Sequence, residues 1–136
     1  MIKVNVKKQS NYPVSSTKIR KNLKNFLAGH GIVSNAEVSV ALVGEKKMLE
    51  VGNKYLKDKS LHNVLSFTAD EVDPNFVLGK AANFVYPPDG VIHLGEIIVC
   101  YPVAFEEAKK EGKLIEEKVM ELIEHGALHL LGIHHE

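Results

Sequence analysis

The chain of 136 residues has the length of one domain, and its 45% hydrophobic and 25% charged residues are ordinary for a globular protein. Its single cysteine excludes an intrachain disulfide, and no apolar segment has the length of a membrane span. The first residues lack the apolar core of a signal peptide, so we expect a cytoplasmic protein.

The charges are unevenly distributed although the net charge is zero. Residues 1–68 hold twelve Lys or Arg against four Asp or Glu, a balance of +8, and residues 69–136 hold five against thirteen, a balance of −8. A basic half can form a surface that attracts polyanions such as nucleic acids. Halves of a sequence need not be halves of a fold, however, and most lysines only keep a surface hydrated.

Periodicity of the apolar residues predicts the elements of the first half. Alternation of apolar and polar residues indicates strands, and apolar residues three or four apart indicate helices. Residues 64–67 lack a polar face, which we interpret as a strand inside a sheet. In chain order, we predict a strand at 2–6, a helix after Ser15 or Ser16 that ends at Gly29 and Gly31, a strand at 38–42, a helix at 45–56 with Met48, Leu49 and Tyr55 inward, and the strand at 64–67.

The second half predicts one strong strand and two helices. Residues 69–90 are irregular, and within them 76–78 and 83–86 are candidates for a small flap or short edge strands. We then predict a strand at 93–100, a helix from Tyr101 to about Lys110, and a last helix from about Lys113 with Leu114, Ile115, Val119, Leu122, Ile123, Gly126 and Leu130 in the core. This order predicts a single α/β (α+β) domain over residues 1–136, with a mixed sheet of about four strands and four to five helices.

The end of the chain carries a metal-ligand motif, H-x-x-x-H-x-x-G-x-x-H. His125 and His129 are four residues apart, so they project from one face of the last helix. Gly132 can end that helix with a left-handed turn and let a third imidazole approach. The spacing favours His135 as that third ligand, with His134 as the alternative. Three neutral imidazoles suit one Zn²⁺ ion and leave a fourth position open for water or substrate, as in catalytic zinc sites.

The same spacing occurs in the long zinc-protease motif H-E-x-x-H-x-x-G-x-x-H, with one difference that matters. The glutamate after the first histidine is the general base of those proteases, and this chain has Gly126 there. We therefore predict a metal site without the peptidase base, and a close contact between Gly126 and the sheet. His93 and Cys100, at the two ends of one predicted strand, are interpreted as structural residues.

Three segments together resemble the YbeY family of bacterial metal-dependent endoribonucleases. Residues 125–135 are similar to the family's H-G-x-L-H-L-x-G-[YF]-D-H, and residues 94–100 to its L-G-D-I-x-I-C. Residues 53–55 followed by 63–67 are similar to its N-x-x-[YF]-R and T-D-V-L-S-F. The resemblance covers the chain from about residue 35 to the end. It implies one Zn²⁺ per chain, single-stranded RNA as substrate, maturation of the small-subunit rRNA 3′ end, and a role in ribosome quality control.

The chain also departs from the family pattern. The arginine that follows Tyr55 in the family, which is thought to take part in cleavage, is Leu56 here. Lysine at 54 or 57 supplies charge without the bidentate geometry of a guanidinium. The candidate RNA-binding residues are Lys54, Lys57, Lys59 and His62, and His62 and Asn63 have the alternative role of closing a turn.

No general base stands beside the motif, and the weak candidates are Glu96 and His134. The nucleophile is either a metal-bound water or the ribose 2′-hydroxyl. Two other functions stay open. One is a metal-dependent hydrolase of another substrate, and the other is a non-catalytic, zinc-containing ribosome-associated factor, which the loss of the arginine favours.

Overall fold

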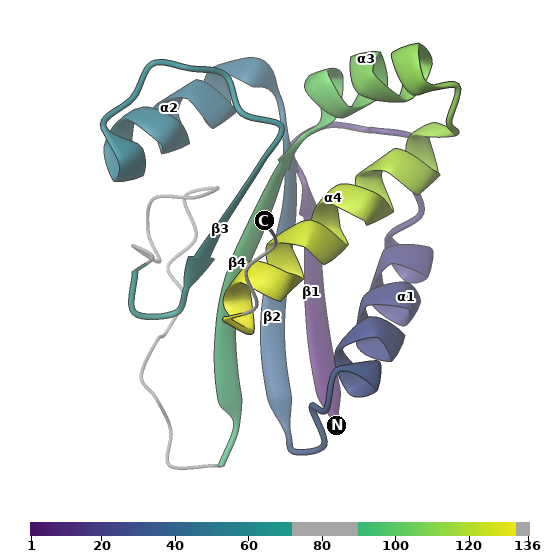
Figure 1. Ribbon diagram of the computed structural model, residues 1–136, viewed down its shortest axis with the longest axis vertical. Coiled ribbons are helices and arrows are strands. Elements are labelled where there is room, and N and C mark those ends of the chain that lie inside the picture. The colour runs from purple at the N-terminus through teal and green to yellow at the C-terminus, as the bar shows by residue number, and fades with distance from the viewer. Residues whose placement is uncertain (72–89, 133–136) are drawn as a thin grey trace.

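The structure, a computed structural model, describes residues 1–71 and 90–132 (Figure 1). Its elements are β1 (Ile2–Lys8), α1 (Ser16–Gly29), β2 (Ala36–Val43), α2 (Glu45–Leu56), β3 (Val64–Thr68), β4 (Ile92–Cys100), α3 (Tyr101–Glu111) and α4 (Ile115–Leu130). This is the predicted order, and it confirms the α+β domain with one mixed sheet. The candidate flap segments at 76–78 and 83–86 lie outside the described residues.

The four strands are arranged in the order β1-β2-β4-β3. β1, β2 and β4 run parallel, and β3 pairs antiparallel with β4. Among the strands of residues 1–71 and 90–132, β3 lies outermost next to β4, so these strands do not confirm the prediction that residues 64–67 form an inner strand. The apolar residues of β3 are explained by helices that lie over both of its faces, α4 on one side and the Tyr55 ring of α2 against Phe67 on the other.

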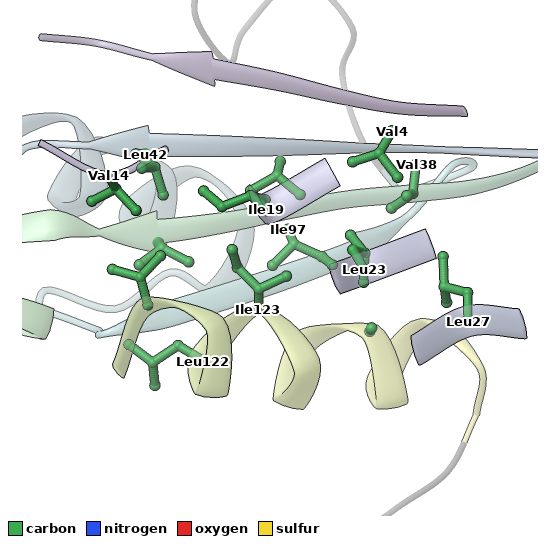
Figure 2. Close-up of a cluster of buried hydrophobic side chains, with 14 of the residues drawn as sticks. Val4, Val14, Ile19, Leu23, Leu27, Val38, Leu42, Ile97, Leu122 and Ile123 are labelled. Atoms are coloured by element: carbon green, nitrogen blue, oxygen red, sulfur yellow. The ribbon is translucent and has the colours of Figure 1, made fainter. Parts of the chain in front are cut away.

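Helices cover the sheet unequally and divide the core in two. α1 packs on β1, and α4 packs on β3 and β4, so both lie on the same face (Figure 1). The larger core lies between this face and the two helices, and Figure 2 shows Ile97 and Val38 of the sheet among side chains of α1 and α4. The smaller core lies on the opposite face under α2 and includes Met48, Val51 and Phe67. None of the helices in the described ranges is long and apolar enough to cross a membrane.

Helix ends follow the local sequence closely. Ser15 caps α1, since its hydroxyl accepts a hydrogen bond from the Lys18 N–H at 3.2 Å. Two predicted core residues are in fact exposed: Leu49 is 40% exposed on α2, and Leu114 is 71% exposed immediately before α4. Val51 of α2, which was not predicted to face inward, is fully buried.

A bulge in β4 sets which side chains face α4. The pairing of β2 with β4 shifts by one residue between Glu37 and Val38, where Gly95 has φ +136°. A Cβ at residue 95 would lie 2.0 Å from the Phe67 carbonyl oxygen, so only glycine fits. Because the shift changes the alternation, Leu94 and Ile97 both enter the larger core although they are three residues apart.

A buried lysine ties α4 to α3. Lys118 is only 5% exposed, and its ammonium lies 3.0 Å from carboxylate oxygens of both Glu111 and Glu121. Glu107 lies 3.4 Å away and also accepts from the Asn63 amide at 3.2 Å. Burial alone would lower the Lys118 pKa, but the paired carboxylates outweigh it and hold the pKa well above its usual value. The cluster therefore stays charged and fixes α3, α4 and the start of β3 together.

Candidate metal site on the last helix

His125 and His129 project side by side from the last turns of α4. Both side chains are exposed, their ring centroids are 6.1 Å apart, and the rings are inclined by 24°. This is the geometry expected for residues one helical turn apart. Two imidazoles on one exposed face are suitable first ligands for a divalent ion, because neutral imidazole is the nitrogen donor that zinc prefers.

The turn after α4 is also as predicted. The helix ends at Leu130, and Gly132 takes φ +76°, with its N–H donating to the His129 carbonyl oxygen at 3.1 Å. A glycine in the left-handed conformation commonly follows the end of a helix. His134 and His135 lie outside the described residues, so the third ligand stays a prediction.

Gly126 lies against the sheet, which confirms the predicted close contact. A Cβ at this position would be 2.8 Å from Ile97 Cγ2 and 3.5 Å from Ser66 Cβ. Gly126 thus lets α4 approach β3 and β4 at the level of the two histidines. The same contact shows that a glutamate here would start its side chain inside the core instead of on the exposed face of the helix.

The histidine pair faces the β3 edge of the sheet. The groove between α1 and α4, about 470 Å³ in volume, is lined by Met120 and Glu124 on the α4 side. Successive helix residues are about 100° apart, so His125 and His129 lie about 100° and 140° round the axis from Glu124. They therefore face away from α1 and toward β3, the strand that α4 also covers.

The candidate RNA-binding lysines lie around the end of α2. Lys54, Lys57 and Lys59 are all exposed, and Lys57 ends the helix in the left-handed conformation, φ 55°. Leu56, at the position of the family's arginine, is 45% exposed. α2 lies on the face of the sheet opposite α4. An RNA strand in contact with both the lysines and the histidines would therefore pass round the β3 edge.

His62 and Asn63 make the contacts of turn-closing residues. The His62 Nε2 atom lies 3.0 Å from Asp58 Oδ2, and its ring packs 3.4 Å from where a Cβ of Gly52 would be. Asp58 also accepts from the Ser60 N–H at 2.7 Å. Asn63 donates to Glu107, as described above. These contacts order the loop from α2 to β3, which carries Lys57 and Lys59.

Glu96, one weak candidate for a general base, lies on the other face of the sheet. It pairs with Phe67, which belongs to the core under α2, whereas its neighbour Ile97 contacts α4. Burial raises the pKa of Glu96 to about 6, although the nearby Lys7 opposes that shift. The structure does not bring this carboxylate together with the histidine pair.

Glu96→Gln should therefore change stability with pH and leave the histidine site unaffected. Because the folded pKa lies above the usual 4.5, ionisation of Glu96 makes the fold less stable as pH rises from about 4.5 to about 6. Allowing for the partial exposure of Glu96, the free energy of unfolding should fall by about 1 kcal/mol over this pH range. Unfolding by urea at several pH values should show the variant losing this part of the pH dependence. Glu106→Gln, on the surface of α3, is the matched control, and equal pH profiles for Glu96→Gln and wild type would contradict the assignment.

Two residues that help to position α4 were not predicted from sequence. Lys118 lies seven residues before His125, hence nearly on the same stripe of α4. Ser66, half-buried on β3, borders Gly126. Glu121 lies one helical turn after Lys118 on α4, but Glu111 belongs to α3, so the burial of Lys118 depends on how the two helices pack. Nothing in the sequence marks Ser66, since its place depends on the packing of α4 on β3.

Comparisons with known proteins identify the family of the chain. The family model described as endoribonuclease YbeY matches residues 3–136. The endoribonuclease YbeY of Dehalococcoides mccartyi is 34% identical over 124 residues, covering 90% of this chain and 72% of that protein. That of Thermobifida fusca is 29% identical over 132 residues, covering 97% and 80%.

The fold has a counterpart among solved structures. The solution structure of TM1509 from Thermotoga maritima superposes with a TM-score of 0.56 at 24% identity, covering 98% of this chain and 75% of that one. The likeness supports the fold. With the family model matched along nearly the whole sequence, the chain belongs to the endoribonuclease YbeY family.

Proposed function

We propose that the protein is a zinc-dependent endoribonuclease that cuts single-stranded RNA in the cytoplasm. Its proposed cellular tasks are maturation of the 3′ end of small-subunit rRNA and ribosome quality control. The observation that carries the proposal is the exposed pair His125 and His129 at the end of α4, in a chain that matches the endoribonuclease family over residues 3–136.

The donor set fits the proposed metal. His125 and His129 would hold one zinc ion with His135, and three imidazoles leave a position for water or a phosphate oxygen. Bound zinc lowers the pKa of water toward about 7 and polarises a phosphoryl oxygen. The protein's own contribution is placement: α4 is pressed onto β3 and β4 at Gly126, and the Lys118 cluster fixes its first turns.

RNA would approach from the β3 edge. The exposed lysines 54, 57 and 59 can neutralise backbone phosphates there, and His62 holds their loop in shape by its contact with Asp58. Unpaired RNA can bend round an edge, whereas an A-form duplex is stiff and keeps its bases paired. We therefore propose single strands as substrate and expect binding to weaken as salt is added.

Cleavage assays with single-stranded RNA, duplex RNA and a peptide panel test the proposal. The zinc-loaded protein should cut single strands in preference to duplex and leave the peptides intact. Chelation should stop the reaction, and added zinc should restore it. Cleavage that persists unchanged after complete chelation, or efficient peptide hydrolysis, would refute the proposed function.

Leu56→Arg should raise the rate of RNA cleavage. The position is exposed at the end of α2, so a guanidinium can enter without displacing core atoms and can bind phosphate in a bidentate manner. We expect an increase of roughly tenfold, equivalent to about 1.4 kcal/mol of added transition-state binding. Leu56→Lys is the matched control and should raise the cleavage rate by less, because an ammonium cannot bind phosphate in a bidentate manner. An unchanged rate in Leu56→Arg would show that this position does not reach the substrate.

The exposed leucine also favours a second candidate function. An apolar side chain where the family has an arginine suits a protein that binds the ribosome without cutting RNA, with zinc in a structural role. In that case zinc would be retained, rRNA would be bound, and no cleavage would be seen with wild type or with Leu56→Arg.

A further inference from the structure

A crevice opens at the carboxyl ends of β1 and β2. The chain leaves β1 toward α1, on the face that α4 also covers, and leaves β2 toward α2, on the opposite face (Figure 1). Neighbouring parallel strands whose connections depart to opposite faces leave a gap between their ends, and α/β proteins commonly bind ligands there. This place is away from the histidine pair, which lies over β3.

The crevice is a broad, basic pocket. Its volume is about 900 Å³, larger than one phosphate group requires. Four lysines line it, Lys7 and Lys8 from β1 and Lys46 and Lys47 from α2, against two glutamates, Glu45 and Glu50. The balance of these six side chains is +2.

The wall of the pocket is fixed in place. The Lys8 ammonium donates to the carbonyl oxygens of Tyr12 at 3.2 Å and Val14 at 3.1 Å, which holds its charge at the end of β1. Gln9 accepts from the Gly44 N–H at 2.8 Å and so joins the end of β1 to the start of α2. Lys46 is exposed, and its ammonium can turn toward a ligand.

We propose that this lysine pocket binds phosphate groups. Ammonium groups on two separate elements surround a volume that fits a nucleotide or several consecutive backbone phosphates, and they act as point charges for such anions. The phosphates come either from single-stranded RNA, in which case the inference rests on the proposed function, or from a small nucleotide. On the first alternative, the pocket is a second contact for the RNA backbone, apart from the lysines at the end of α2.

The test compares two double variants with the same loss of charge. Lys46→Gln with Lys47→Gln removes two lysines of the pocket, and Lys21→Gln with Lys24→Gln removes two exposed lysines of α1. Affinity for labelled single-stranded RNA is measured by anisotropy between roughly 50 and 200 mM salt. Affinity for ADP and for pyrophosphate is measured by calorimetry. All samples are metal-free, so binding is observed whether or not the protein cuts RNA.

If RNA supplies the phosphates, the pocket variant should bind RNA more weakly. The slope of log affinity against log salt concentration should also be shallower by about 1.4. The affinity of this variant should then change about sevenfold less than that of wild type over this range. If a small nucleotide supplies them, ADP or pyrophosphate should lose affinity in the pocket variant and RNA should not. Glu45→Gln with Glu50→Gln should strengthen whichever ligand binds. Equal losses in the pocket and α1 variants, or unchanged affinity for all three ligands in the pocket variant, would overturn the proposal.

Discussion

Replacing His129 with alanine should remove the metal and stop RNA cleavage. His129 is exposed beside His125 on the flank of α4 that faces β3, where no other described histidine approaches the pair. Loss of a residue that only supports a metal ligand typically lowers affinity 10- to 100-fold, so loss of a ligand itself should lower it by more than about 100-fold. Elemental analysis of the purified variant and cleavage of single-stranded RNA at matched purity give the two measurements.

His30→Ala is the matched control for this experiment. His30 is also an exposed histidine near a helix end, where its Nδ1 lies 2.9 Å from the Phe26 carbonyl oxygen. It should keep both metal and cleavage. Since His125 belongs to the same pair, His125→Ala should behave like His129→Ala. Full metal retention in both variants would show that α4 does not carry the site.

Gly126→Ala should destabilise the fold even though alanine is the better helix former. The new Cβ would lie 2.8 Å from Ile97 Cγ2, and Ile97 is completely buried in the larger core, so neither side can move freely. Overpacking of this kind costs about 1–3 kcal/mol, against a gain of about 1 kcal/mol in helix propensity. We expect a net loss of up to about 2 kcal/mol and a fall in Tm of up to roughly 8 °C, measured by thermal unfolding.

Gly29→Ala tests the reason for that loss. Gly29 is the last residue of α1, and a Cβ there would meet no atom within 4 Å. This substitution should be neutral or slightly stabilising, so a comparable fall in Tm for both alanines would contradict the packing argument. Gly126→Glu should be more damaging than Gly126→Ala, because it also places a carboxylate against Ile97. It should not create peptidase activity.

The order of elements was readable from sequence because each element carries a local signal. Ser15 caps α1 and glycines end α1, α3 and α4, all of which act within a few residues. The position of Gly126 was readable because the spacing of apolar residues in α4 places this glycine among the core-facing positions. The histidine spacing predicted that His125 and His129 share one face of the helix, and both side chains lie exposed on one face of α4.

What the sequence did not indicate depends on contacts between distant segments. The apolar run of β3 indicates that both faces are covered, but it does not distinguish cover by helices from a place between strands. Leu49 and Leu114 have the hydrophobicity of core residues, yet the direction of each side chain depends on how its helix is docked. The bulge at Gly95 and the burial of Lys118 likewise depend on partners more than ten residues away or on other elements.

The position of α4 has a consequence for biosynthesis. α4 is the last helix of the described chain, and it supplies Val119, Leu122, Ile123 and Ala127 to the larger core. Until it has been translated, the apolar side chains of β3 and β4 beneath it have no cover, and a nascent chain in that state is a target for chaperones. The segment that completes the core is also the one that carries His125 and His129. A chain in which α4 has not yet docked on the sheet therefore cannot bring the proposed metal-binding pair to its place beside β3.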